Sequence, residues 1–160
     1  GLAIPRPTEG SKRRYRLSEV QIGTGTEDRK KERMRLMGYM LSQNMKIIPE
    51  YNAAVMVLSK EIKEKFNFAD GDSEGFVNLA LNIRSVKVSA LFTEGDEFIR
   101  VSLRSKGDFS VNRLSRGFFN GGGHERAAGG RLFMPIAKVE EYFVKSLGDF
   151  IEQEKQAHLL

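Results

Sequence analysis

The chain has 160 residues, of which 40% are hydrophobic and 29% charged, with a net charge of +5 and no cysteine. These values are typical of a single globular domain, and the absence of cysteine excludes disulfides and thiolate metal sites. There is no apolar run near the roughly 20 residues of a membrane span and no secretory signal, so we expect a cytoplasmic protein with no membrane partner.

Residues 1–28 contain two prolines, a Gly-Thr-Gly-Thr run and the basic cluster Lys12-Arg13-Arg14-Tyr15-Arg16. This composition is typical of an arm or linker, and contact of the cluster with a phosphate backbone is the alternative. We therefore predict an arm or linker over 1–28, one domain over 29–156 and a tail over 157–160.

A helical pattern begins at Glu27, with apolar side chains at positions i, i+3, i+6 and i+7. A methionine-rich face can form an adaptable binding groove, but packing against a core is the commoner role. The core-facing residues are therefore predicted to be Met34, Met37, Met40 and Leu41.

Short elements alternate in the next part of the chain. A short extended segment over 45–48 is followed by an apolar run that predicts a buried strand over 53–58. Ser59 suits the N-cap of a short helix over 60–66, and 75–83 has the pattern of another helix.

The clearest local prediction is a hairpin, with a strand over 86–92, a turn at 94–97 and a returning strand over 98–103. Alternation along the second strand places four polar side chains on one face: Arg100, Ser102, Arg104 and Lys106. Such a face is most often the solvated side of a sheet, although a guanidinium can also bind a phosphate in a bidentate manner.

The remaining elements are a helix over 111–118, capped by Asp108 or Ser110, a strand over 130–134 and a final helix over 137–153. Phe118 is expected in the core, whereas Phe119 could contact a ligand. Helices and strands thus interleave, which predicts an α/β domain.

Five glycines occur in the ten residues from Gly121 to Gly130. Successive amide groups of such a run can form a nest for an anion, and His124 adds a donor beside it. The alternative interpretation is a glycine-rich connection with an exposed histidine.

The run Gly121-Gly122-Gly123-His124 followed by Ala127-Ala128-Gly129 resembles the signature of the DHH-associated domain, first subfamily, of the DHH phosphoesterases. The segments Val101–Lys106 and Asp72–Asn78 resemble other parts of this family, in the family's order, within a match over roughly residues 34–155. The similarity points to the oligoribonuclease and nucleoside bisphosphate phosphatase branch. It implies a single domain with a small mixed central sheet flanked by helices.

In this family the manganese ligands belong to a separate N-terminal domain with an Asp-His-His motif, which the sequence lacks. We therefore expect no catalytic residue, metal site or cofactor in this chain, and we expect the chain alone to be inactive. Mn²⁺ is expected in the absent domain. The resemblance implies a substrate or phosphate site formed by Arg104, Ser102, Asn120, Gly121, Gly122, Gly123, His124 and Arg126.

The expected function is substrate binding in a metal-dependent phosphoesterase that hydrolyses short oligonucleotides or nucleoside bisphosphates. A cyclic dinucleotide is a third candidate substrate. Expected partners are a nucleotide or short single-stranded RNA or DNA, and the N-terminal DHH domain. The alternatives are a non-catalytic RNA-binding module, as at the end of alanyl-tRNA synthetases, and a domain that mainly forms homodimers.

Overall fold

The structure is a computed structural model that describes residues 24–158. One sheet of six strands has the order β1-β2-β3-β4-β6-β5. β2 and β3 are parallel and the other neighbouring pairs are antiparallel. The predicted α/β fold with a mixed sheet is therefore confirmed. The strands are β1 (Lys46–Ile48), β2 (Ala53–Leu58), β3 (Val88–Glu94), β4 (Ile99–Ser105), β5 (Gly122–Gly123) and β6 (Ala127–Leu132).

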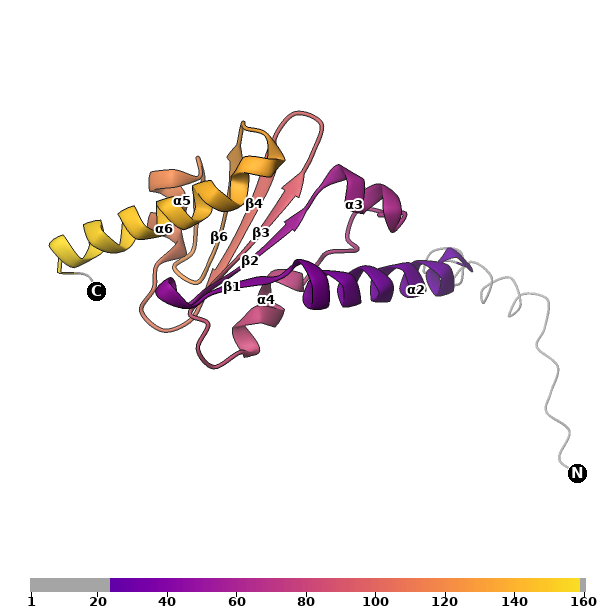
Figure 1. The fold of residues 1–160 in the computed structure, drawn as a ribbon, viewed down its shortest axis with the longest axis horizontal. Helices are drawn as coiled ribbons and strands as arrows, with labels where there is room; N and C mark the ends of the chain where they lie inside the picture. Colours follow the sequence, from indigo (N-terminus) through magenta and orange to yellow (C-terminus); the bar gives the residue numbers. More distant parts are fainter. Residues whose placement is uncertain (1–23, 159–160) are drawn as a thin grey trace, which may run out of the picture.

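Helices cover the sheet from two sides, with α5 and α6 on one side and α2, α3 and α4 on the other (Figure 1). Within the described residues, no helix has the length and apolar character needed to cross a bilayer. The α-helices are α2 (Thr24–Tyr39), α3 (Lys60–Lys65), α4 (Phe76–Leu79), α5 (Val111–Phe118) and α6 (Val139–Gln156), and the short π and 3₁₀ segments are η1 (Met40–Asn44), η2 (Pro49–Tyr51), η3 (Ala80–Asn82) and η4 (Ile136–Lys138).

Most of the local predictions are confirmed. Strand β2, the β3–β4 hairpin and the helices after Ser59 and Ser110 lie where the patterns placed them. Both serines cap their helices, because the Ser59 hydroxyl accepts from the Ile62 amide at 3.2 Å and the Ser110 hydroxyl accepts from the Arg113 amide at 3.1 Å.

The main core lies between the sheet and helices α5 and α6. Phe92 of β3 contacts the rings of Phe119 and Phe143, with centroid distances of 5.8 and 5.5 Å. Phe119 is completely buried, so the predicted ligand contact of Phe119 is wrong. It follows α5 directly and turns into the core because the helix ends with its apolar stripe facing the sheet.

A second core lies between the other face of the sheet and α2, η1 and α4. The predicted position of Met34 is wrong, since it is 69% exposed, whereas Leu36 and Met40, spaced i, i+4, are buried. The buried strand residues of this layer and of the small cluster beside it come from β2, β3 and the segment before β3. None of them belongs to β4, β5 or β6, so the apolar packing of this layer ends at β3 in the described part of the chain, although α4 lies next to β4.

The predicted domain bounds stay a prediction. Helix α2 begins at Thr24, inside the range assigned to the arm, and the basic cluster Lys12–Arg16 lies outside the described residues.

The glycine run forms a tight hairpin in which β5 pairs with β6, and this was not predicted. The expected strand over 130–134 in fact begins at Ala127. A Cβ on Gly121 would lie 2.0 Å from the Gly129 carbonyl oxygen, and one on Gly130 would lie 2.1 Å from the Phe119 carbonyl oxygen. These glycines are therefore required because backbone packs directly against backbone.

Gly122 does not share this constraint. A Cβ there would meet only side-chain atoms of Asn112 and Arg116, at 3.3 Å or more. A substitution at Gly122 therefore meets less steric resistance than one at Gly121.

We predict that Gly121→Ala lowers the free energy of unfolding by about 2 kcal/mol or more, because β6 must move away from the new methyl group. Gly122→Ala serves as the matched control and should change that free energy by less than about 1 kcal/mol. Urea unfolding of the two variants measures both values. Equal stabilities would show that the hairpin has room at Gly121.

Candidate functional site

The uncovered face of the sheet carries an ordered set of side chains from three strands. In the β3–β4–β6 register, Thr93 lies opposite Arg100, which lies opposite Arg131. The next row is Leu91, Ser102 and Gly129, and the row after it is Ser89, Arg104 and Ala127. Ser89 and Leu91 are buried, and we call the surface formed by the other members of these rows the open face.

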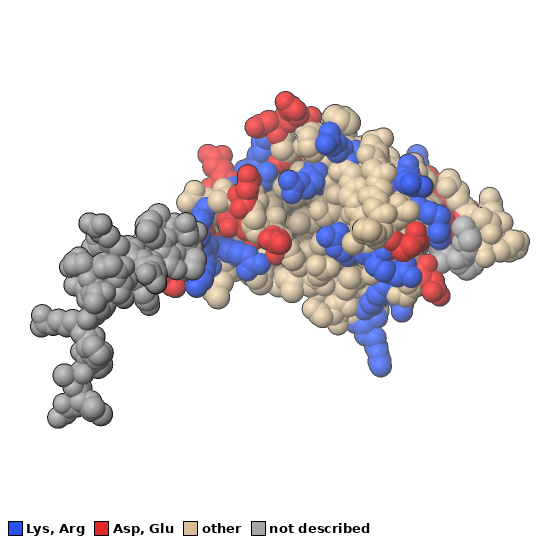
Figure 2. Space-filling model, turned by 180° about the vertical axis from the view of Figure 1, so that it is seen from behind, with Lys and Arg blue, Asp and Glu red and all other residues tan. Residues whose placement is uncertain are grey.

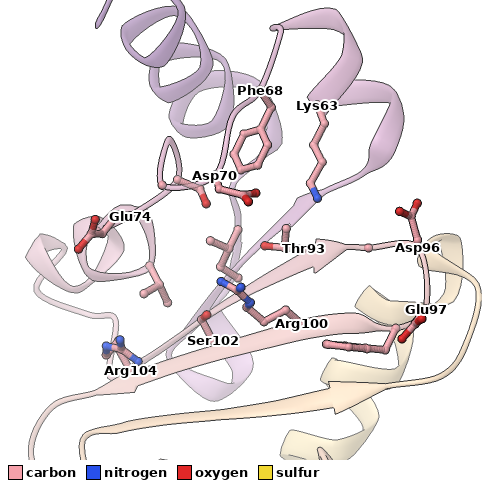
Figure 3. Close-up of a pocket in the computed structure, with 17 residues that line it drawn as sticks. Lys63, Phe68, Asp70, Glu74, Thr93, Asp96, Glu97, Arg100, Ser102 and Arg104 are labelled. Carbon is pink, nitrogen blue, oxygen red and sulfur yellow. The ribbon is translucent and has the colours of Figure 1, made fainter. Parts of the chain in front are cut away.

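Two clefts of about 710 and 520 Å³ meet on the open face. Both are lined by Phe98, which directly precedes β4, and by Arg100, Ser102 and Arg104 of that strand. Figure 3 shows Arg100, Ser102 and Arg104 projecting from one side of the strand. Strand β4 therefore forms a floor that the two clefts share.

The first, which we call the loop cleft, is bounded by α3 and the segment 68–75. Its wall carries the carboxylates of Asp70, Glu74, Asp96 and Glu97 (Figure 3). The Lys60 ammonium is hydrogen-bonded to Asp96 at 2.9 Å, which lowers the pKa of the carboxyl and raises the pKa of Lys60. This cleft is mixed in charge and offers both donors and acceptors.

The second, which we call the hairpin cleft, lies between β4 and the β5–β6 hairpin. Its hairpin wall is shallow because the residues there are small, including Gly122, Gly123, Ala127 and Gly129. Three arginines line it, Arg100, Arg104 and Arg131, and its described lining includes no carboxylate. A cleft of this composition is suited to bind an anion such as a phosphate.

The arginines of the open face form no ion pair among the described residues. Arg104, which is half-buried, donates from Nη1 to the Leu103 carbonyl oxygen at 2.8 Å. That bond fixes one edge of the guanidinium. Ser102 is also half-buried, and its side chain makes no hydrogen bond within residues 24–158. Both groups are thus placed to meet a ligand in the cleft.

Lys106, the last polar residue of the alternating run, has a different role. Its ammonium donates to the carbonyl oxygens of Leu81 and Ile83, at 2.6 and 3.0 Å. The Lys106 ammonium therefore satisfies carbonyl groups at the C-terminal end of η3, and it is not free to bind a substrate.

The predicted amide nest does not form. The Gly121 amide donates to the Ser115 carbonyl at 3.3 Å, and the Gly123 amide donates to Asn112 Oδ1 at 3.0 Å. The His124 amide donates to the Ala127 carbonyl at 2.7 Å. Because these donors are already used, the glycine backbone contributes shape to the cleft rather than a row of free donors.

His124 lies at the exposed tip of the β5–β6 hairpin, outside the residues that line the two clefts. Its neighbour Glu125 is hydrogen-bonded by the Ser110 and Asn112 side chains, which lowers the pKa of that carboxyl. Arg113 also lies 3.5 Å from Glu125. The negative charge beside His124 is therefore balanced within the protein.

Two other predicted site residues brace the hairpin. The Asn120 side chain donates to the Arg131 carbonyl at 2.9 Å, and Asn120 has the left-handed backbone that asparagine tolerates. Arg126 donates to the Phe109 carbonyl at 3.3 Å. Of the predicted residues, the structure brings Arg104, Ser102, Gly122 and Gly123 into one cleft and leaves Gly121, His124, Asn120 and Arg126 outside the clefts.

Sequence reasoning missed Arg131 and Phe98 as lining residues. Arg131 lies two positions after Gly129 and would share its face in a strand, which was the signal for Arg131. The strand was predicted to begin only at Gly130, so this signal was missed. Phe98 was placed at the start of the returning strand without any role in a site.

The residues present do not fit a metal ion. Over residues 24–158, no group of three or more His, Asp or Glu side chains is arranged to hold one. The manganese implied by the resemblance therefore has no donor set in the described part of this chain, and we derive no chemical step through it.

Comparison with known proteins identifies the family. Residues 49–153 match the model of the DHHA1 domain. The bifunctional oligoribonuclease and PAP phosphatase NrnA of Bacillus subtilis is 31% identical over 119 residues, which is 74% of this chain and 37% of that protein. A probable NrnA of Streptococcus mutans is 34% identical over 110 residues, covering 68% of this chain and 34% of that protein. The chain thus spans about a third of the length of these curated relatives.

Solved structures agree with this fold. An exopolyphosphatase-related protein from Bacteroides fragilis superposes with a TM-score of 0.72 and 44% identity, over 78% of this chain and 36% of that one. The pGpG-specific phosphodiesterase PggH of Vibrio cholerae gives a TM-score of 0.54 at 16% identity, over 75% of this chain and 40% of that one, which supports the fold alone. The chain therefore belongs to the DHHA1 family, the DHH-associated domain of the DHH phosphoesterases, in the oligoribonuclease and PAP phosphatase branch.

Proposed function

We propose that this chain is the substrate-binding domain of a metal-dependent DHH phosphoesterase that hydrolyses short oligonucleotides or nucleoside bisphosphates. The observation that carries the proposal is the hairpin cleft, in which three arginines face small residues and no described carboxylate. Arg104 and Ser102 would bind a phosphate there, and His124 would approach the same ligand from the tip of the hairpin.

The proposed role of this chain is to hold and orient the ester. In the relatives the reaction is assigned to whole proteins, of which this chain matches only about a third, so the hydrolytic step would belong to a DHH domain of the intact protein. Metal ions of that domain would activate the attacking water. Orientation by the hairpin cleft lowers the entropic part of the barrier without any bond chemistry in this chain.

Surface charge favours a nucleotide-end site over a nucleic-acid tract. Figure 2 shows Lys and Arg side chains spread over the face seen from behind, among carboxylates and uncharged surface. A protein that binds a long tract needs a basic groove that follows the backbone. On this face of the described residues, basic and acidic side chains are interspersed rather than separated into one basic groove.

We predict that Arg104→Ala weakens binding of a 3′,5′-bisphosphate nucleotide by about thirtyfold. This fold-change corresponds to the loss of about 2 kcal/mol that is expected for a charge-assisted hydrogen bond. The matched control is Arg84→Ala, which removes the same charge at an exposed position outside the clefts. Isothermal titration calorimetry measures both affinities, and thermal unfolding checks that neither variant loses stability. An equal loss of affinity in the two variants would show that Arg104 contributes only through the net charge of the chain.

The role of His124 can be tested separately. His124→Ala should weaken the same binding about fivefold, the effect of one hydrogen bond, and leave the melting temperature unchanged because the side chain is exposed. His158→Ala removes the other histidine of the chain, at the end of α6, and should have no effect. Unchanged binding by His124→Ala would remove this residue from the site.

A further inference from the structure

The end of the open face nearest the β3–β4 turn carries two phenylalanines and two arginines. The Arg131 guanidinium lies 4.6 Å from the centre of the Phe98 ring. The centroids of the Phe98 and Phe133 rings lie 6.3 Å apart. Phe133 is 71% exposed, which is the highest value among the exposed large hydrophobic side chains of the described residues. We call Phe98, Arg131 and Phe133 the aromatic platform.

This platform is unfavourable for the free protein in two respects. Arg100 and Arg131 are directly opposite in the β4–β6 register, and like charges opposite one another destabilise a strand pair. Neither forms an ion pair with a described carboxylate. In addition, most of the Phe133 ring is left in water. A ligand that combines a flat apolar face with a negative charge would relieve both conditions.

The platform is continuous with the proposed phosphate site but distinct from it. Phe98 lines the hairpin cleft together with Ser102 and Arg104. Arg104 follows Phe98 by six positions, a distance of about 20 Å along an extended strand. A ligand phosphate held by Arg104 cannot touch Phe98 itself, so the platform must receive a different part of the ligand.

We propose that the aromatic platform stacks a nucleobase of the substrate, with Arg100 and Arg131 contacting the phosphate next to it. This inference rests on the proposed function, because it places the ligand in the hairpin cleft. Aromatic side chains and arginine planes are the usual stacking partners of unpaired bases. Because every base has a π-face, stacking of this kind is expected to tolerate any base.

The test compares a ligand that has bases with one that has none. The 5′-phosphorylated dinucleotide pApA and ribose 5-phosphate are titrated against the wild-type chain and its variants. Phe133→Ala should weaken pApA binding about tenfold and leave ribose 5-phosphate binding unchanged, as expected for loss of one stacked base. Arg104→Ala should weaken both. Met34→Ala, which removes a 69% exposed apolar side chain on α2, should change neither.

A second readout does not depend on a loss of affinity. The chain contains no tryptophan, so Phe133→Trp introduces a single indole reporter into the platform. This variant should keep its affinity for pApA, and its indole emission should be quenched by pApA but not by ribose 5-phosphate.

The outcomes separate the two proposals. If Arg104→Ala weakens pApA binding while Phe133→Ala does not, and the indole emission of the Phe133→Trp variant stays constant, the platform is overturned and the phosphate site remains. If Arg104→Ala changes the affinity for neither ligand, or the wild-type chain binds neither, the proposed function fails, and the platform falls with it.

Discussion

The described helices pack apolar side chains on one face of the sheet from β2 to β6, and on the other face they do so only as far as β3. This unequal cover determines where a ligand can bind. The apolar side chains of α2 and α4 pack on Met56, Leu58 and Leu91, and beyond Leu91 the residues on that face are polar or small. Because arginine, serine and glycine gain little from burial under an apolar helix, nothing in this part of the chain drives a helix to cover β4 and β6. The uncovered half of the sheet is the floor of both clefts.

The glycine hairpin has a steric role first. Its backbone packs so closely on β6 and on the end of α5 that no Cβ fits at Gly121 or Gly130, and its amides are largely bonded within the protein. This close packing keeps the wall beside Arg104 and Ser102 low, which opens the cleft toward the ligand. A motif that looks like a set of amide donors thus contributes mainly by the absence of side chains. The donors that face the cleft are Arg131 of β6 and the polar side chains of β4, a strand whose alternation looked like an ordinary solvated surface.

The proposed function separates the binding groups of this chain from the catalytic groups of the intact protein. The described chain holds arginines without ion-pair partners on one surface and lacks a set of donors for a metal ion. It also spans only about a third of the length of its curated relatives. A binding surface of this kind can be kept rigid by its own core, since Phe92, Phe119 and Phe143 support β3 and the hairpin from behind. The geometry of the arginines therefore depends on the fold of this domain, whatever supplies the chemistry.

The sequence alone determined most of the elements, because period-two alternation, serine caps and apolar runs are local signals that the tertiary structure did not override. It also determined the family, through the motif at 121–130, and it placed Arg104 beside that motif. The tertiary structure decided the sheet order, the burial of Phe119 and Leu36, and the pairing of β5 with β6. Glycines carry no side-chain pattern from which a strand can be predicted, and only the packed backbone shows which of them are required. Arg131 and Phe98 enter the site for the same reason, since their neighbours come from pairing between strands distant in the chain, and a local pattern contains no information about that register.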